Sequence, residues 1–156
     1  MKKTKTIAFA LLLLAAASVT AAAQTPMTNS TQAAPEKSLY QRVGGYDAIA
    51  AVVDDFVARL VGDKQFVRFF DGHSTDSLKR IRQHIVDQFC AGAGGPCIYT
   101  GRDMKTSHQG LGITEAQWDA AAKHLIATFD KFKVPAKEKD ELVAFVTSLK
   151  KDIVEK

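Results

Sequence analysis

Residues 99–114 read YTGRDMKTSHQGLGIT, and this stretch decides how the rest of the chain is interpreted. His108 lies between a segment long enough for one helical turn, beginning at Met104, and two glycines, Gly110 and Gly112. The apolar residues Met104, Leu111 and Ile113 surround this single imidazole. A hydrophobic slot with one imidazole is what an axial ligand to haem iron requires. Spacing alone fits a buried structural histidine equally well.

Four segments carry apolar residues at intervals of three and four, which is the period of an amphipathic helix. They cover about residues 45–62, 77–91, 114–129 and 136–153. Thr114 and Gln117 have the spacing of a helix N-terminal capping box. No segment shows convincing period-two alternation with turn signals. The sequence therefore predicts an all-α fold.

Residues 1–23 have the pattern of a secretory signal peptide: lysines, then an apolar run from Ile7 to Ala17, then small residues before Gln24. A membrane anchor is the alternative, but the run is shorter than the ~20 residues that span a bilayer. Residues 24–37 are polar without an apolar period and predict a flexible linker before a domain at 38–156. We expect an exported protein, periplasmic or secreted, without membrane contact after signal cleavage.

The formal charge of +4 belongs mostly to the export signal. Residues 1–23 contain three lysines and no acidic residue, so the remaining chain has a formal charge of +1. A nearly balanced surface gives no electrostatic reason to expect nucleic acid or an acidic membrane as a partner.

Cys90 and Cys97 are the two cysteines of the chain. In an exported protein a disulfide between them would persist and close a small loop rich in glycine. Two unpaired thiols are the alternative, because the sequence does not establish how close the two Cα atoms come. A zinc site is a weaker alternative, because a second pair of ligands is missing.

Several segments share their pattern with one protein family: Leu39–Gly45 (LYQRVGG), Val53–Phe56 (VDDF), the pair Phe69–Phe70, the turn Gly94–Pro96 (GGP) and the stretch 99–114. Together they resemble the group I truncated haemoglobins over roughly residues 38–153. The resemblance implies a two-over-two sandwich of helices around haem (iron protoporphyrin IX), with His108 as the proximal ligand of the iron.

The resemblance also implies the lining of the haem pocket: Val57, Phe70, Ile81, His84, Ile85, Phe89, Tyr99, Met104, His108, Ile113 and Trp118. Family members commonly have a tyrosine after the phenylalanine of the first long helix, and its hydroxyl donates to bound oxygen. Here that position is Val57, which has no donor. We therefore expect a weaker hydrogen bond to bound oxygen, and faster release, than in relatives that have the tyrosine.

The register of the helix at 77–91 has two alternatives. Anchoring it on the GGP turn places Ile81, Ile85 and Phe89 over the haem with His84 at its edge, whereas anchoring it on the phenylalanine pair turns Arg82 and Val86 inward. We prefer the first register because the second puts a charge into the pocket. In it, His84 matches the position that supplies a sixth iron ligand in some cyanobacterial relatives, although an edge histidine near a haem propionate or solvent is an equally good interpretation.

The other two histidines carry weaker signals. His73 lies in a polar segment and fits an exposed loop residue, and His124 lies on a regular helix and fits a structural role at the border of the core.

Three functions remain open at this point. The first is reversible binding of a diatomic gas, namely oxygen, nitric oxide or carbon monoxide. The second is haem-dependent nitric oxide dioxygenase or other redox activity, which requires an external electron donor. The third is a helical interaction domain without a cofactor.

Overall fold

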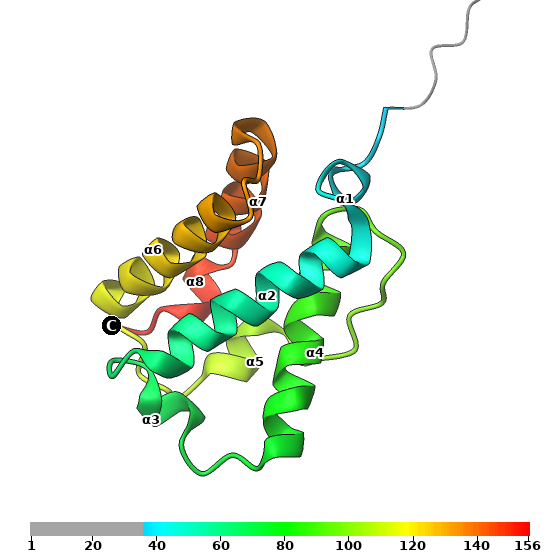
Figure 1. The fold of residues 1–156 in the computed structure, drawn as a ribbon. Coiled ribbons are helices and arrows are strands. Elements are labelled where there is room, and N and C mark those ends of the chain that lie inside the picture. The colour runs from blue at the N-terminus through cyan, green and yellow to red at the C-terminus, as the bar shows by residue number, and fades with distance from the viewer. Residues whose placement is uncertain (1–35) are drawn as a thin grey trace, which may run out of the picture. The chain divides into compact units, whose positions relative to one another are not determined.

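The computed structural model describes residues 36–156, so the predicted signal peptide and most of the predicted linker lie outside the described residues. Within this range the chain is helical without strands (Figure 1), and none of its helices combines the length and apolar composition needed to cross a bilayer. The helices are α1 (Leu39–Arg42), α2 (Gly45–Gly62), α3 (Val67–Phe70), α4 (Thr75–Gly92), α5 (Met104–His108), α6 (Glu115–Lys131), α7 (Ala136–Ser148) and α8 (Lys150–Ile153).

Side-chain caps mark where four of these helices begin, namely α1, α4, α5 and α6, and the last two bear on the site. Thr114 Oγ1 accepts a hydrogen bond from the N–H of Gln117, and the Gln117 side chain accepts one from the N–H of Thr114, so the predicted capping box of α6 is present. Asp103 caps α5 by accepting from the N–H of Thr106 at 2.8 Å. This second cap fixes the start of the short helix that ends at His108.

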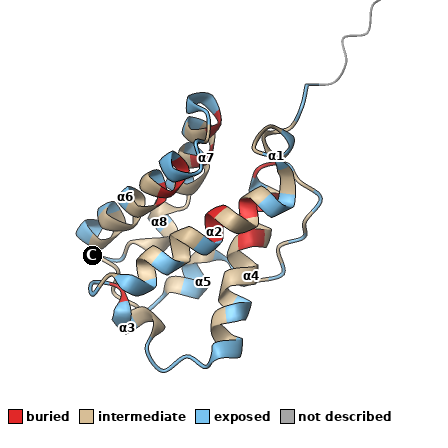
Figure 2. Cartoon of the chain, viewed as in Figure 1, coloured by how far each residue is buried: buried red, intermediate tan, exposed pale blue. Residues whose placement is uncertain are grey.

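The central helix α2 packs against both α4 and α6, and Figure 1 shows α4 and the pair α6–α7 on different sides of it. The buried core joins these helices, and Figure 2 shows buried positions on α2, α4 and α7. Its members are Ile49, Val52, Val53, Val86, Phe89, Cys90, Leu125, Phe129 and Leu142. The expected all-α fold is confirmed.

A polar contact also joins α2 to α6. Asp55 accepts hydrogen bonds from Arg59 at 2.6 Å and from the hydroxyl of Thr128 at 2.9 Å, and it pairs with Lys131. These donors, the Arg59 guanidinium foremost, hold the pKa of Asp55 well below its usual range. Thr128 is fully buried, so this hydrogen bond satisfies its hydroxyl within the core.

The last helical segment differs from the prediction. A single helix over about residues 136–153 was expected, but α7 ends at Ser148 and α8 is a separate turn. After α8 the chain returns to the start of α6. The N–H of Glu115 donates to the carbonyl of Lys156 and the N–H of Glu155 to that of Ile113, each at 2.9 Å.

The cysteines form a disulfide. Cys90 is fully buried near the end of α4, and its bond to Cys97 brings the two Cα atoms to 5.8 Å. Because neither sulfur is a free thiol, the alternatives of unpaired cysteines and of a zinc site are excluded.

Candidate functional site

A cavity of about 690 Å³ lies within the helical domain. Ligand pockets usually measure roughly 300–1,000 Å³, so the space is large enough for a sizeable organic group. The walls are mainly apolar and include Phe56, Leu60, Phe66, Phe69, Phe70, Ile81, Ile85, Phe89, Met104, Leu111, Ile113, Trp118, Ala121, Ala122, Leu125, Phe145, Val146, Leu149 and Ile153. The polar lining residues are His73, His84, Gln88, Tyr99, Arg102, Ser107, His108 and Gln117.

His108 lines this cavity from the last position of α5. Its Nδ1 lies 2.8 Å from the backbone carbonyl oxygen of Met104, one helical turn earlier. A carbonyl only accepts hydrogen bonds, so Nδ1 carries a proton, and in the neutral ring Nε2 therefore keeps its lone pair. A histidine that ligates a metal is usually oriented in this way by a bond from its other ring nitrogen. The His108 side chain is therefore prepared to donate Nε2 to a metal in the cavity.

The structure shows the first of the two registers considered for α4. Ile81, His84 and Ile85 line the cavity, together with Phe89 one turn later. Arg82 points away, since its guanidinium binds the carboxylate of Asp54 at 2.7 and 2.8 Å. Val86 is fully buried in the core but is not among the lining residues.

His84 has an unsatisfied ring nitrogen. Its Nδ1 is buried and has no hydrogen-bond partner among the described residues. The ring packs edge-on against Tyr99, with 6.0 Å between the ring centroids. A buried polar atom without a partner is costly, so the hydrogen bonding of His84 is incomplete within the described part of the chain.

Val57 is a correction to the sequence-based prediction. It packs against the core and is not among the residues that line the cavity. Phe56 and Leu60, four residues apart on α2, line the cavity instead. Successive side chains of a helix point in directions about 100° apart, so a shift of one residue decides whether a side chain of α2 faces the cavity or the core. Neither lining residue of α2 has a hydrogen-bond donor on its side chain.

Tyr99 and the remaining predicted residues line the cavity as expected from the resemblance: Phe70, Met104, Ile113 and Trp118. The Tyr99 hydroxyl donates to the carbonyl of Arg102 at 2.6 Å. Burial raises the pKa of this hydroxyl. Tyr99 therefore stays neutral and holds together the turn that leads into α5.

The other two histidines have different surroundings. His73 is exposed at the edge of the cavity, between α3 and α4. His124 lies outside the cavity lining, and its Nε2 is 2.8 Å from the carboxylate of Asp63 at the end of α2. His124 thus has the structural role expected from the sequence.

Sequence reasoning missed the wall contributed by the C-terminal helices. Phe145, Leu149 and Ile153 recur every four residues and all line the cavity. Their spacing was visible in the sequence, but it predicts an apolar face without saying whether that face meets protein or a ligand.

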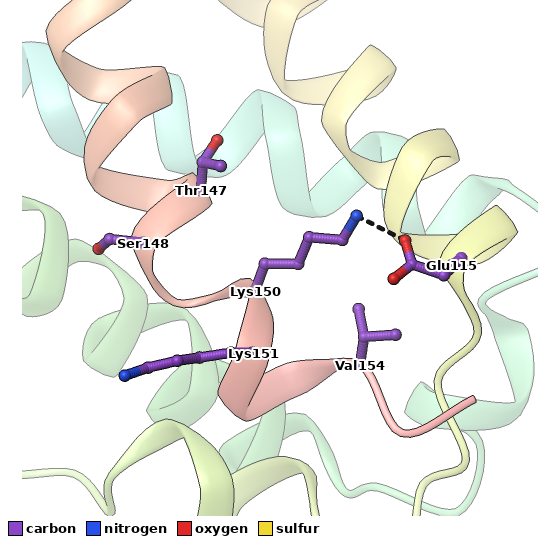
Figure 3. A pocket seen from close by; sticks show the side chains of 6 residues that line it. All are labelled: Glu115, Thr147, Ser148, Lys150, Lys151 and Val154. Atoms are coloured by element: carbon purple, nitrogen blue, oxygen red, sulfur yellow. Dashed lines mark ion pairs between the residues drawn. The ribbon is translucent and has the colours of Figure 1, made fainter.

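A second, more open pocket of about 430 Å³ lies between the start of α6 and the junction of α7 with α8 (Figure 3). Lys150 reaches across it to the carboxylate of Glu115, with 2.5 Å between Nζ and Oε2. This ion pair ties α8 to the start of α6. None of the predicted site residues lines this pocket.

No group of three or more His, Cys, Asp or Glu side chains within residues 36–156 is arranged to hold a metal ion. An apolar cavity with one oriented imidazole is instead the donor set of a haem pocket, where the macrocycle brings the other iron ligands itself.

Comparison with known sequences gives a consistent set of relatives. The family described as "Bacterial-like globin" matches residues 38–155. A protein named group 1 truncated hemoglobin GlbN from Mycolicibacterium paratuberculosis is 35% identical over 116 residues, which are 74% of this chain and 83% of the relative. The protein of the same name from Nostoc commune is 34% identical over 119 residues, covering 76% of this chain and 98% of the relative.

Solved structures agree with the sequences. The truncated hemoglobin of Tetrahymena pyriformis in its Fe(III) form is 26% identical, with a TM-score of 0.69 over 77% of this chain and 100% of that one. The 2/2 hemoglobin of Synechococcus sp. PCC 7002, in the cyanomet state with covalently attached heme, is 28% identical with the same TM-score and coverage.

Proposed function

Because the chain belongs to the bacterial-like globins, and within them to the group 1 truncated hemoglobins, we propose that it reversibly binds a diatomic gas at a haem held by His108. The family is one of haem-binding globins, and the cavity fits such a group. The observation that carries the proposal is the His108 side chain, whose Nδ1 is held by the Met104 carbonyl and whose Nε2 is left to ligate iron.

When bound, haem would supply an iron atom that can take up oxygen, nitric oxide or carbon monoxide. The chain's own part is to hold that iron through His108, to surround the macrocycle with apolar side chains, and to supply or withhold hydrogen bonds at the open position. Arg102, at the edge of the cavity, is a candidate to pair with a haem propionate.

The hydrogen bonds at the open position depend on α4 in this proposal. Phe56 and Leu60 of α2 have no donor, whereas His84 and Gln88 of α4 both line the cavity with polar side chains. The position of His84 in the cavity lining is in accord with a role toward the bound gas, either as an iron ligand that the gas displaces or as a hydrogen-bond donor to the gas. We expect oxygen to leave faster than from relatives with a tyrosine on the first long helix.

The first experiment is the visible absorption spectrum of the purified protein with haem, in ferric, ferrous and carbon monoxide forms, beside a His108→Ala variant. We expect one haem per chain and a spectrum that is lost or strongly altered in the variant. A parent protein that binds no haem would refute the proposal and leave a helical domain without a cofactor.

A second experiment tests His84. The His84→Ala variant should change either the ferrous spectrum or the oxygen dissociation rate, depending on whether His84 binds iron or the gas. If the variant equals the parent in both, neither role of His84 holds.

Adding nitric oxide to protein equilibrated with oxygen then separates gas binding from dioxygenase activity, since sustained nitrate formation with an electron donor would favour the enzyme.

We also propose that the protein works outside the cytoplasm. The signal-peptide pattern of residues 1–23 motivates this, and the disulfide between Cys90 and Cys97 is in accord with an oxidising compartment. Cell fractionation followed by N-terminal sequencing tests it. A cytoplasmic protein that still begins at Met1 would contradict it.

A further inference from the structure

The last residues of the chain bind the loop that follows His108. The Glu155 carboxylate accepts hydrogen bonds from the backbone N–H of Gly110, at 2.5 Å, and from that of Gly112, at 3.0 Å. One carboxylate oxygen serves each N–H. Glu155 is 45 residues from Gly110 in the sequence, so this contact depends on the tertiary fold.

The loop is shaped to present these two N–H groups. Gly110 and Gly112 have φ values of +83° and +62°, a region that side-chain-bearing residues rarely adopt. Backbone N–H groups that converge in this way form a small anion-binding cradle. Hydrogen bonds from such a cradle to a carboxylate are charge-assisted and are stronger than neutral ones.

The loop is connected directly to the His108 backbone. The N–H of Leu111 donates to the carbonyl of His108 at 3.1 Å, and the N–H of Gln109 donates to that of Lys105 at 2.9 Å. The α5 helix itself has only five residues, too few to be stable without outside support. Contacts to Gly110 and Gly112 therefore restrain the position of His108.

Glu155 is itself held firmly. Its N–H donates to the Ile113 carbonyl at 2.9 Å, and the Lys156 carbonyl accepts from the N–H of Glu115 at the same distance. The ion pair between Lys150 and Glu115 fixes the preceding helix α8 (Figure 3). The carboxylate thus acts from a segment tied to the start of the long helix α6.

We propose that Glu155 is a positioning residue for His108: its carboxylate clamps the loop at Gly110 and Gly112 and so holds the imidazole where Nε2 meets the iron. This inference rests on the proposed function, since it assigns His108 to the iron. Glu155 lies outside the cavity lining and does not act on the gas itself.

The clamp is tested first without haem, by amide hydrogen exchange of Gly110 and Gly112 followed by NMR. Glu155→Ala should speed exchange at both glycines by at least about tenfold, because each loses a charge-assisted partner. Glu155→Gln keeps the size of the side chain but aims its NH₂ group at one of the two N–H donors, so exchange should rise mainly at one glycine. The control is Asp119→Asn, which removes a carboxylate from the exposed face of α6.

The positioning role is tested next on the haem-loaded protein. Glu155→Ala should release haem at least about fivefold faster than the parent and shift the iron–histidine stretching band in the ferrous resonance Raman spectrum, whereas Asp119→Asn should do neither. Glu155→Gln should lie between the two, and it serves alone if the alanine variant does not fold.

The possible failures are distinct. Unchanged glycine exchange in both Glu155 variants would refute the clamp. Faster exchange with a parent-like stretching band and haem release would show a clamp that does not position His108, and would also overturn the proposal. A parent that binds no haem would refute the proposed function and the positioning role with it, although glycine exchange would still report whether the clamp forms.

Discussion

Replacing Gly92 by alanine should weaken haem binding while leaving the haem-free domain nearly as stable as before. Gly92 is the last residue of α4. A Cβ atom there would lie only 2.3 Å from Cζ of Phe145, whereas ordinary van der Waals contact begins near 3.4 Å. The Phe145 ring must therefore move by more than 1 Å. Phe145 lines the cavity and packs edge-on against Phe89, which also lines it.

The size of the effect depends on whether the cavity is filled. In the haem-free protein the Phe145 ring can turn into the cavity, and an alanine also gains up to about 1 kcal/mol over glycine in a helix. With haem in place, the same movement is an overpacking, which typically costs about 1–3 kcal/mol. The affinity for haem should then fall by roughly 5- to 150-fold.

The assay compares haem transfer to an excess of a strong acceptor apoglobin with urea unfolding of the haem-free protein. Gly62→Ala is the matched control, because Gly62 also ends a helix but an added Cβ meets nothing within 4 Å. Haem transfer from Gly92→Ala that is as slow as from the control would contradict this prediction. A loss in the unfolding free energy of the haem-free variant as large as its loss in the free energy of haem binding would contradict it too.

Three further predictions concern stability. Asp55→Asn should lower the free energy of unfolding at pH 7 by about 2 kcal/mol. The pKa of Asp55 is lowered in the fold, so the carboxylate contributes its full stabilisation above the unfolded pKa near 3.9 and loses it as the pH falls. Between pH 7 and pH 3 the free energy of unfolding should therefore fall less in the variant than in the parent. Equal losses in urea unfolding would contradict this. Reducing the Cys90–Cys97 bond, which closes a loop with a sequence separation of 7, should cost roughly 2.5 kcal/mol and lower Tm by about 10 °C, and a variant with alanine at both positions should not respond to dithiothreitol. Phe129→Ala, at a fully buried position, should cost about 3–5 kcal/mol, whereas Phe132→Ala, at a position 40% exposed, should cost less than about 1 kcal/mol; similar losses would contradict the assigned core.

Most helices were predictable because their determinants are local. Apolar periodicity places α2 and α4 within two residues of their observed bounds, and the capping box at Thr114 marks the start of α6. The split between α7 and α8 was not predictable. Apolar residues continue across Leu149 at helical spacing, and the separate turn of α8 precedes a tail that pairs with Ile113 and Glu115.

The site was predictable where neighbours in the sequence define it. His108 and the apolar residues around it are within one short stretch, so its slot could be recognised before the fold was known. The family resemblance predicted that Val57 lines the cavity, but in the structure the orientation of α2 turns its neighbour Phe56 into the lining. Glu155 had no signal at all, since a surface glutamate near a chain end reveals nothing of a contact 45 residues away.

The cavity wall is distributed along the whole domain, from Phe56 on α2 to Ile153 on α8. A fragment that lacks either Phe56 or Ile153, whether a nascent polypeptide or a product of proteolysis, lacks part of the haem pocket. Haem therefore binds only after the domain has closed, and it stabilises that closed state in proportion to its supply. In a cell, scarce haem would leave a population that opens more often and is degraded sooner.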